Sequence, residues 1–195
     1  MENNEKTIQI VAFTTNADSS QFSSPYEIIK IFLKYHNHIL LKQKIGLALA
    51  FKTNLAKSKS DTQIMICSVL DLSREYNRIK DVNCYLLFID LESKDSNNQL
   101  NLIKEYFIKH CNLSKKLYII GLYNTYLENV KKNIDENEIK KTFEEGKIKK
   151  FIYKEMNLDD TQKISDFILE IFVESENATN KKKINKENKE SCAIF

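Results

Sequence analysis

Short apolar runs alternate along the chain with stretches whose apolar residues recur at helical spacing, and this pattern predicts alternating strands and helices. The clearest run is Asn83–Asp90 (NCYLLFID), which is almost entirely apolar, as a central strand covered on both faces should be. The other expected strands are residues 6–13, 45–51, 63–70, 116–122 and 150–153. Polar residues at 57–61 separate the second and third of these, which favours a hairpin between them.

Helices are expected between these strands and after the last one. The sequence SPYE at 24–27 marks a helix start, with serine as the N-cap and proline at the first helical position. An amphipathic pattern over 95–111 has the expected inward residues Leu100, Ile103, Phe107 and Ile108. The polar stretch 124–145 is rich in helix formers and ends at Gly146, the position expected of a C-cap. Residues 160–173 predict a last helix with an apolar face.

This alternation predicts an α/β fold, a three-layer sandwich on a mostly parallel sheet of six strands. The hairpin formed by 45–51 and 63–70 would supply one antiparallel edge strand. Residues 1–173 would make up this domain. From Glu174 onward the apolar content falls, so residues 174–195 are expected to form a disordered, lysine-rich tail.

Composition narrows the function. The chain has 195 residues, and 30 Lys and Arg against 27 Asp and Glu give a net charge of +3, so no nucleic-acid partner is expected from charge. Its only glycines are Gly46, Gly121 and Gly146, and no two of them are close in sequence. Phosphate-binding loops need clustered glycines, which excludes an intact P-loop, an intact dinucleotide fingerprint and a kinase glycine loop. The polar start of the chain, without an apolar stretch, favours an intracellular protein.

The four cysteines do not form a metal or redox motif, because no two of them are spaced as C-x-x-C. Three of them, Cys67, Cys84 and Cys111, lie in apolar runs and are expected to be buried, inert thiols. His110 next to Cys111 is a poor nucleophile pair, because adjacent residues of a helix do not face each other. A catalytic constellation for an unrelated α/β enzyme is therefore missing.

Cys192 differs, since it begins the sequence Cys192-Ala193-Ile194-Phe195, which fits a C-a-a-X box. Phenylalanine at the last position favours a covalent geranylgeranyl group, added by a prenyltransferase; the alternative is an idle cysteine at a frayed end. The preceding residues 181–190 have five lysines and two glutamates, a net +3. This run is either a solvated linker or a contact with an anionic membrane surface, which would place the protein on the cytoplasmic face of a membrane with a cytosolic pool.

The order of elements and the type of tail together resemble a Ras-superfamily small GTPase, over residues 5–173 and 181–195. The segment DLSREY at 71–76, the run Asn83–Asp90 and the helix residues NQLNLIK at 98–104 are similar to the family's D-x-x-G segment, its next strand and the following helix. Residues 116–121 are similar to the strand that leads into the family's N-K-x-D motif, which reads the guanine base.

The resemblance assigns Ala12–Ser19 to the phosphate loop G-x-x-x-x-G-K-[ST], with both glycines replaced by alanine and the lysine by Asp18. A charge pair at ~4 Å and an effective dielectric constant of ~20 is worth about 4 kcal/mol, so reversing its sign is expected to cripple phosphate binding. Ser19 retains the hydroxyl that binds magnesium in the family, and Asp71 could reach magnesium through water. Two such ligands hold magnesium weakly without a phosphate.

The other nucleotide motifs are also degenerate. Arg74 replaces the glycine of D-x-x-G, and Glu75 replaces the glutamine that orients water. Leu122 stands for the base-reading asparagine and Thr125 for the aspartate, although threonine cannot accept two guanine N–H bonds as a carboxylate does. The residues YKEM at 153–156 replace the family's S-A-K.

The expected function is a membrane-tethered, Ras-like protein-interaction module, a pseudo-GTPase with no cofactor and no catalytic residues. Protein partners would bind a switch-like surface within about 42–60 and 72–81, with Arg74 and Tyr76 as candidate anchors. The alternative is a highly divergent small GTPase that still binds magnesium with GTP or GDP, through Ser19 and Asp71, and acts as a switch.

Overall fold

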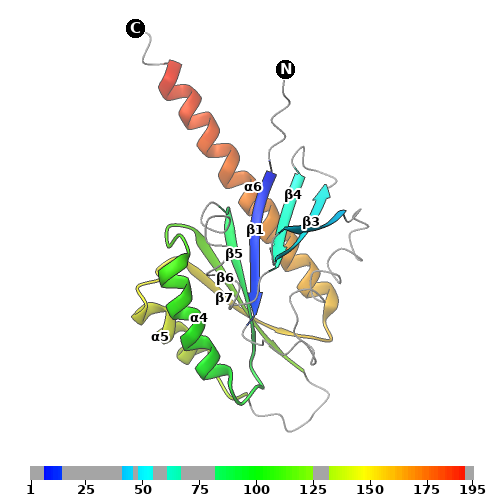
Figure 1. Ribbon diagram of the computed structural model, residues 1–195, viewed down its shortest axis with the longest axis vertical. Helices are drawn as coiled ribbons and strands as arrows, with labels where there is room; N and C mark the ends of the chain where they lie inside the picture. The colour runs from blue at the N-terminus through cyan, green and yellow to red at the C-terminus, as the bar shows by residue number, and fades with distance from the viewer. Residues whose placement is uncertain are drawn as a thin grey trace.

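The computed structural model describes residues 7–14, 41–45, 48–54, 61–66, 82–124 and 132–191. Within these ranges the chain forms one seven-stranded sheet in the order β2-β3-β4-β1-β5-β6-β7 (Figure 1). The strands are β1 (Thr7–Thr14), β2 (Leu41–Ile45), β3 (Ala48–Asn54), β4 (Asp61–Ile66), β5 (Cys84–Asp90), β6 (Lys116–Tyr123) and β7 (Phe151–Asn157). The helices of the described ranges are α4 (Ser96–His110), α5 (Glu136–Glu145) and α6 (Thr161–Ser191).

The α/β class expected from the sequence is confirmed, and parallel strands form its centre. β5 pairs with β6 and β6 with β7 in parallel, and β1 pairs in parallel with both β4 and β5. The expected hairpin is present as the antiparallel pair β3 and β4. Because β1, β5, β6 and β7 run in one direction, their carboxyl ends lie along the same edge of the sheet.

The sheet differs from the expected six strands with a single antiparallel edge strand. Residues 41–45 form an additional strand, β2, which pairs antiparallel with β3 and occupies the edge. The antiparallel strand β3 therefore lies one place inside the edge. Lysines at 42 and 44 make the segment LKQKI too polar to stand out as an apolar run, although lysine is typical of edge strands.

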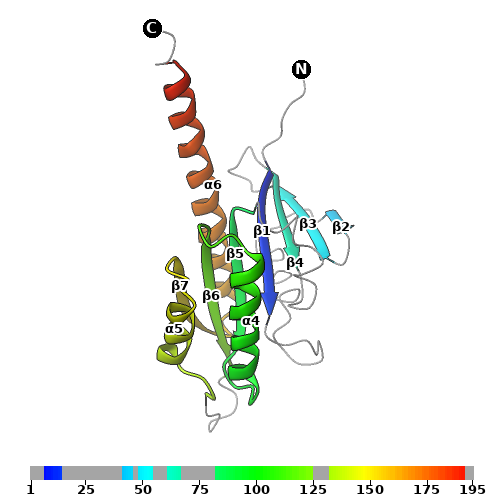
Figure 2. The ribbon, with the colours of Figure 1, turned by 60° about the vertical axis from the view of Figure 1, so that its left-hand side comes forward.

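Two apolar cores cover the two faces of the central strands. Successive side chains of β5 point to opposite faces and so enter the two cores in turn, which explains why the whole strand is apolar. Tyr85, Leu87 and Ile89 pack on one face with residues of α4 and α5. Cys84, Leu86 and Phe88 pack on the other face with residues of α6. Figure 2 shows the sheet between these two helical layers. The described part is thus layered as helices, sheet and helix.

Helix α4 confirms three of its four expected core residues. Leu100, Ile103 and Phe107 are buried against the sheet, but the expectation for Ile108 was wrong, since 42% of its surface is exposed. Ile108 follows Phe107 in α4, so its side chain is turned by about 100° away from the direction of Phe107. It lies instead near Gly146, the residue after α5. It therefore contacts the neighbouring helix end while remaining open to solvent.

Helix α6 differs most from the sequence expectation. It continues from Thr161 through Ser191, where a disordered tail was expected from residue 174. The segment contains neither glycine nor proline, so nothing in it ends the helix. Ser175 is 7% exposed, which extends the packed body beyond the expected boundary at 173. Figure 1 shows the last turns of α6 projecting past the sheet.

Other boundaries shift by a few residues. β7 extends to Asn157, beyond the expected end at 153. α5 begins only at Glu136, after an unforeseen capping box in which Asp135 and Glu138 each bond the other's backbone N–H. The helix expected from residue 24 lies outside the described residues.

Gly121 of β6 provides a test of this packing. A Cβ atom at Gly121 would lie 2.7 Å from Oη of Tyr153 and 3.0 Å from Cδ1 of Leu91. We expect Gly121→Ala to lower the free energy of unfolding by about 1–3 kcal/mol, as overpacking of a core does. Urea denaturation followed by circular dichroism measures the change.

The same substitution in a Tyr153→Phe background separates the two contacts. Removing the hydroxyl takes away the nearest atom, so the cost of Gly121→Ala should be smaller in that background. An equal cost in both backgrounds would show that the hydroxyl does not limit the space at this position.

Candidate functional site

The edge formed by the carboxyl ends of β1, β5, β6 and β7 is the first candidate site, because open α/β sheets bind ligands at this edge. The described residues that end the strands there are Thr14, Asp90, Tyr123 and Asn157. β1 lies between β4 and β5, so strand connections diverge beside it and the edge includes a topological switch point.

The position assigned to the first glycine of a phosphate loop lies inside a strand. Ala12 pairs with Ile66 of β4 and with Leu86 of β5, and β1 continues to Thr14. Strand backbone therefore occupies the place where a phosphate loop would begin. The N–H groups of Ala12 and its neighbours belong to a ladder that is paired on both sides, whereas anion binding needs N–H groups that converge on the ligand.

Asp90, which ends β5, organises the loop that follows it. Its Oδ1 accepts hydrogen bonds from the backbone N–H groups of Glu92, at 2.9 Å, and Ser93, at 3.2 Å. The hydroxyl of the buried Ser96 donates to the backbone carbonyl of Asp90. The carboxylate thus closes the turn that leads into α4, as expected of an aspartate at a strand end, and it is engaged within its own loop.

Glu92 connects this loop to the next one along the edge. Its Oε1 accepts from the backbone N–H of Asn124, at 2.8 Å. Asn133 donates through its side-chain amide to the carbonyl of Glu92 and through its backbone N–H to the carbonyl of Leu91, at 2.7 Å. These bonds hold the β5–α4 loop to both ends of the β6–α5 connection, at Asn124 and at Asn133. No sequence signal identified Glu92 or Asn133 beforehand, because their partners are far away in sequence.

Leu122, expected where the base-reading asparagine would stand, is a core residue. It lies in β6 opposite Met156 of β7, and both are buried in the cluster that packs against α6. An apolar side chain enclosed in this way offers neither a donor nor an acceptor to a base. Thr125, the other expected base-reading position, lies outside the described residues.

The residues expected in place of S-A-K belong to β7 and have partners within the chain. Tyr153 donates from its hydroxyl to Glu155, at 2.9 Å, and Glu155 forms an ion pair with Lys132. Lys154 lies over the ring of Phe167 of α6, 4.2 Å from its centroid. Burial, together with the bond to Glu155, raises the pKa of Tyr153 and keeps the phenol protonated.

A cleft of about 280 Å³ opens between the ends of β6 and β7 and the first turns of α6. Its charged lining residues are Lys154, Lys163, Glu155, Asp160, Asp166 and Glu170. Hydrogen bonds from Lys163 hold the pKa of Asp160 below its usual value. Four carboxylates and two lysines line the cleft, and Lys132 outside it pairs with Glu155, so one net negative charge remains, which disfavours an anionic ligand.

The predicted site residues Ser19, Asp71 and Cys192 all lie outside the described residues, as do Asp18 and Arg74. The structure therefore does not bring them together or separate them. Within the ranges that it does describe, His, Cys, Asp and Glu form no group of three or more suited to a metal ion.

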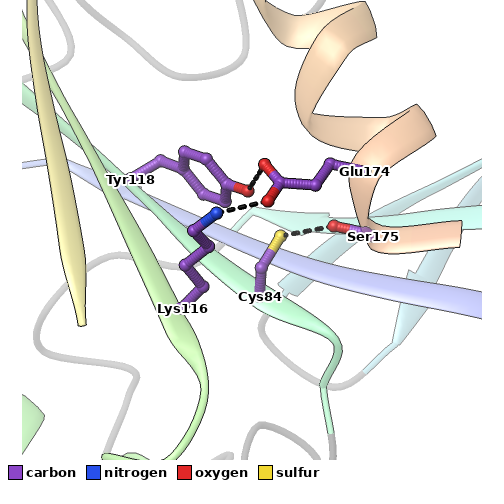
Figure 3. A network of polar contacts seen from close by, with 5 residues as sticks. All are labelled: Cys84, Lys116, Tyr118, Glu174 and Ser175. Atoms are coloured by element: carbon purple, nitrogen blue, oxygen red, sulfur yellow. Dashed lines mark hydrogen bonds and ion pairs between the residues drawn. The ribbon is translucent and has the colours of Figure 1, made fainter. Parts of the chain in front are cut away.

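A second polar site holds α6 to the sheet at the opposite end of the strands (Figure 3). The carboxylate of Glu174 accepts from Lys116 and from the hydroxyl of Tyr118, the latter at 2.5 Å. Beside it, Ser175 donates to the sulfur of Cys84 at 3.3 Å. Two adjacent residues of α6 thus bond three residues of β5 and β6, just before the helix leaves the sheet.

The protonation states of this network follow from burial and hydrogen bonding. The expectation of a buried cysteine is confirmed at Cys84, and burial raises the pKa of its thiol to about 12. Hydrogen bonds from Lys116 and Tyr118 hold the pKa of Glu174 below its usual value near 4.5. Burial and the bond to Glu174 raise the pKa of Tyr118, so its hydroxyl stays a donor. Cys111 is half-buried, and Cys67 lies outside the described residues.

No protein-family model matches the sequence, and no curated protein matches it significantly. Among the described helices, none combines the length and the apolar character needed to cross a bilayer.

Glu174 makes stability depend on pH in a defined direction. Its pKa is lower in the folded than in the unfolded protein, so its contribution is present above about pH 4.5 and is lost as pH falls through the folded value. We expect Glu174→Gln to lower the free energy of unfolding at neutral pH by about 1 kcal/mol, because the pair is half-exposed. Urea denaturation at neutral and acidic pH should show this difference vanishing in acid.

Glu170→Gln provides the matched control, because Glu170 lies one turn earlier on α6 and outside the network of Figure 3. Its effect should change less between neutral and acidic pH. A difference for Glu174→Gln that persists unchanged in acid would contradict the assigned role of the carboxylate.

Proposed function

We propose that this chain is a Ras-like small-GTPase domain that has lost ordinary GTP binding and hydrolysis and works as a membrane-tethered protein-interaction module. The described sheet, with parallel central strands and helices on both faces, is compatible with such an architecture. The proposal also draws on the sequence resemblance, which extends over nearly the whole chain.

The observation that carries the loss of nucleotide binding is the burial of Leu122. At 1% exposure it fills the core between β6, β7 and α6, at the position that the resemblance gives to the base-reading asparagine. Nearby, Glu155 is neutralised by Lys132, and the cleft beside β7 is acidic. A guanine base would not find its asparagine at this position.

The phosphate end of the site is expected to be impaired as well. Ala12 is held in the paired ladder of β1, so the loop after it starts later than in a phosphate loop. The reversed charge at Asp18 adds repulsion toward phosphate. Without a γ-phosphate to order them, the switch-like segments near 42–60 and 72–81 would bind partners independently of nucleotide.

Membrane attachment is proposed through Cys192, as a thioether to a geranylgeranyl group. A single lipid chain gives reversible binding, so a second signal is needed for stable residence. Lysines 181–183, 186 and 189 would supply it, at ~1 kcal/mol per lysine near an anionic surface. We infer residence at the cytoplasmic face of a membrane, with a cytosolic pool.

The nucleotide content of the purified protein tests the first part. We expect the recombinant full chain to release no stoichiometric GDP or GTP on denaturation, as measured by ion-exchange chromatography. Adding magnesium with GDP should leave Tm unchanged, whereas a ligand at 100 times its Kd adds about 2.7 kcal/mol and roughly 5–10 °C. An active small GTPase treated in parallel serves as the control.

A stoichiometric nucleotide peak, or a rise in Tm of several degrees with magnesium and GDP, would reject the pseudo-GTPase. It would favour a divergent GTP-binding switch in its place. In that case, Ser19→Ala and Asp71→Ala should abolish the rise, because they are the retained candidates for holding magnesium.

The anchor is tested by cell fractionation. We expect Cys192→Ser to move the protein entirely to the soluble fraction, because it removes the sulfur that would carry the lipid. Changing Lys181, Lys182 and Lys183 together to Gln should weaken membrane binding without abolishing it. Mass spectrometry that finds an unmodified Cys192-Ala-Ile-Phe195 terminus in cells would reject the anchor.

A further inference from the structure

The loops before β6 and β7 gather lysines at the end of the sheet opposite the candidate nucleotide edge. The first loop ends with Lys115, next to Lys116 at the start of β6, and the second contains Lys147, Lys149 and Lys150. Neither segment 111–116 nor segment 146–150 contains an acidic residue. The two loops therefore bring five cations to one end of the domain.

Backbone pairing places these two loops side by side. Leu117 and Phe151 are partners in the parallel register of β6 and β7, and the N–H of Leu117 donates to the carbonyl of Lys150 at 2.9 Å. The ammonium of Lys150 reaches the carbonyl of Ser114, at 3.4 Å. The lysines of the two loops thus belong to one continuous surface.

The turn after α5 holds its lysines outward. Ile148 is buried and its N–H donates to the carbonyl of Phe143 at 3.0 Å, while Lys147 and Lys149 on either side are exposed. Lys147 has φ 58°, a left-handed conformation that favours glycine or asparagine. A lysine therefore occupies a position where its backbone conformation is unfavourable.

Among the residues that the structure describes, most of this charge has no ion-pair partner. Lys116 is paired with Glu174, but Lys115, Lys147, Lys149 and Lys150 form no ion pair with another described residue. The nearest carboxylates along the chain are Glu144 and Glu145, at the end of α5, and Glu145 is matched by Lys141. We call Lys115, Lys147, Lys149 and Lys150 the lysine surface.

The lysine surface is continuous with the exit of α6. One cleft is lined from both sides. Its lining residues include Ser114, Lys115 and Lys116 at the start of β6 and Glu174, Ser175 and Ala178 of α6. The network of Figure 3 holds the helix at this place. Beyond it, α6 carries the lysines at 181–183 and 186, toward Cys192.

We propose that the lysine surface is a second contact with an anionic lipid bilayer, which fixes the orientation of the domain on the membrane that the tail reaches. The proposal rests on the proposed function for the direction of the tail. The occupant is a bilayer because the surface adjoins the helix that leads to the C-a-a-X box and because it contains lysine only, which acts as a point charge toward headgroups. Because α6 rises by about 24 Å from Ser175 to Ser191, the lysine surface and the tail reach one bilayer together with this part of α6 lying along the membrane.

Vesicle binding by the unlipidated full chain tests the surface apart from prenylation. The variant Lys147→Gln, Lys149→Gln, Lys150→Gln is compared with the control Lys94→Gln, Lys132→Gln, Lys163→Gln, which removes three exposed lysines at the opposite edge of the sheet. On phosphatidylcholine vesicles containing phosphatidylserine, we expect the first variant to lose at least about tenfold in binding and the control less than about twofold. Circular dichroism confirms that both variants are folded.

Equal losses in the two variants would overturn the proposal, because net charge alone would then explain binding. The proposal would also be overturned if the parent chain did not bind phosphatidylserine vesicles. Binding of RNA by the parent chain at the same salt concentration would not rescue it. The protein in this experiment carries no prenyl group, and no nucleotide is added. A negative result therefore leaves the tests of Cys192 and of nucleotide binding untouched.

Discussion

Burial of β5 and β6 on both faces is the constraint on which the described structure depends. Alternate residues of each strand enter two separate cores, one closed by α4 and α5 and the other by α6. Fully burying one large apolar side chain contributes about 1.5–3 kcal/mol to the free energy of unfolding. These two strands therefore supply a large part of the stabilisation that comes from the buried side chains of the described residues. Side chains such as Tyr85 and Phe88 serve opposite cores although they are close in sequence. Each helical layer is therefore positioned by the same pair of strands.

The elements that the sequence predicts well are those whose pattern is dominated by this burial. Asn83–Asp90 is apolar throughout because both of its faces are covered, and Phe107 recurs at the spacing set by Ile103 and Leu100. β2 is too polar to follow from an apolar pattern, since an edge strand gains its place from backbone pairing. The length of α6 was missed because loss of apolar residues ends a core but does not end a helix.

The polar contacts of the two candidate regions were beyond sequence analysis for a different reason. Glu92, Asn133 and Glu174 acquire partners that lie 32 to 58 residues away, so only the fold brings them together. The motif assigned Leu122 to a base-reading position, and the apolar character of its side chain was the informative feature there. An apolar residue in a strand is more often a core residue than a ligand-binding one. The strand ends at the candidate edge use their polar groups to tie loops to one another.

Helix α6 is continuous across the boundary between packed core and projecting segment. From Ser175 to Ser191 it rises by about 24 Å, at 1.5 Å per residue, while Ile164, Ile168 and Phe172 anchor its first half. A stiff rod fixed at one end is a lever, whereas a flexible tail absorbs a pull on its tip by uncoiling. A force applied near residue 191 therefore produces a torque at Glu174 and Ser175, and through them on β5 and β6. Traction on the carboxyl terminus becomes mechanical load on the centre of the sheet.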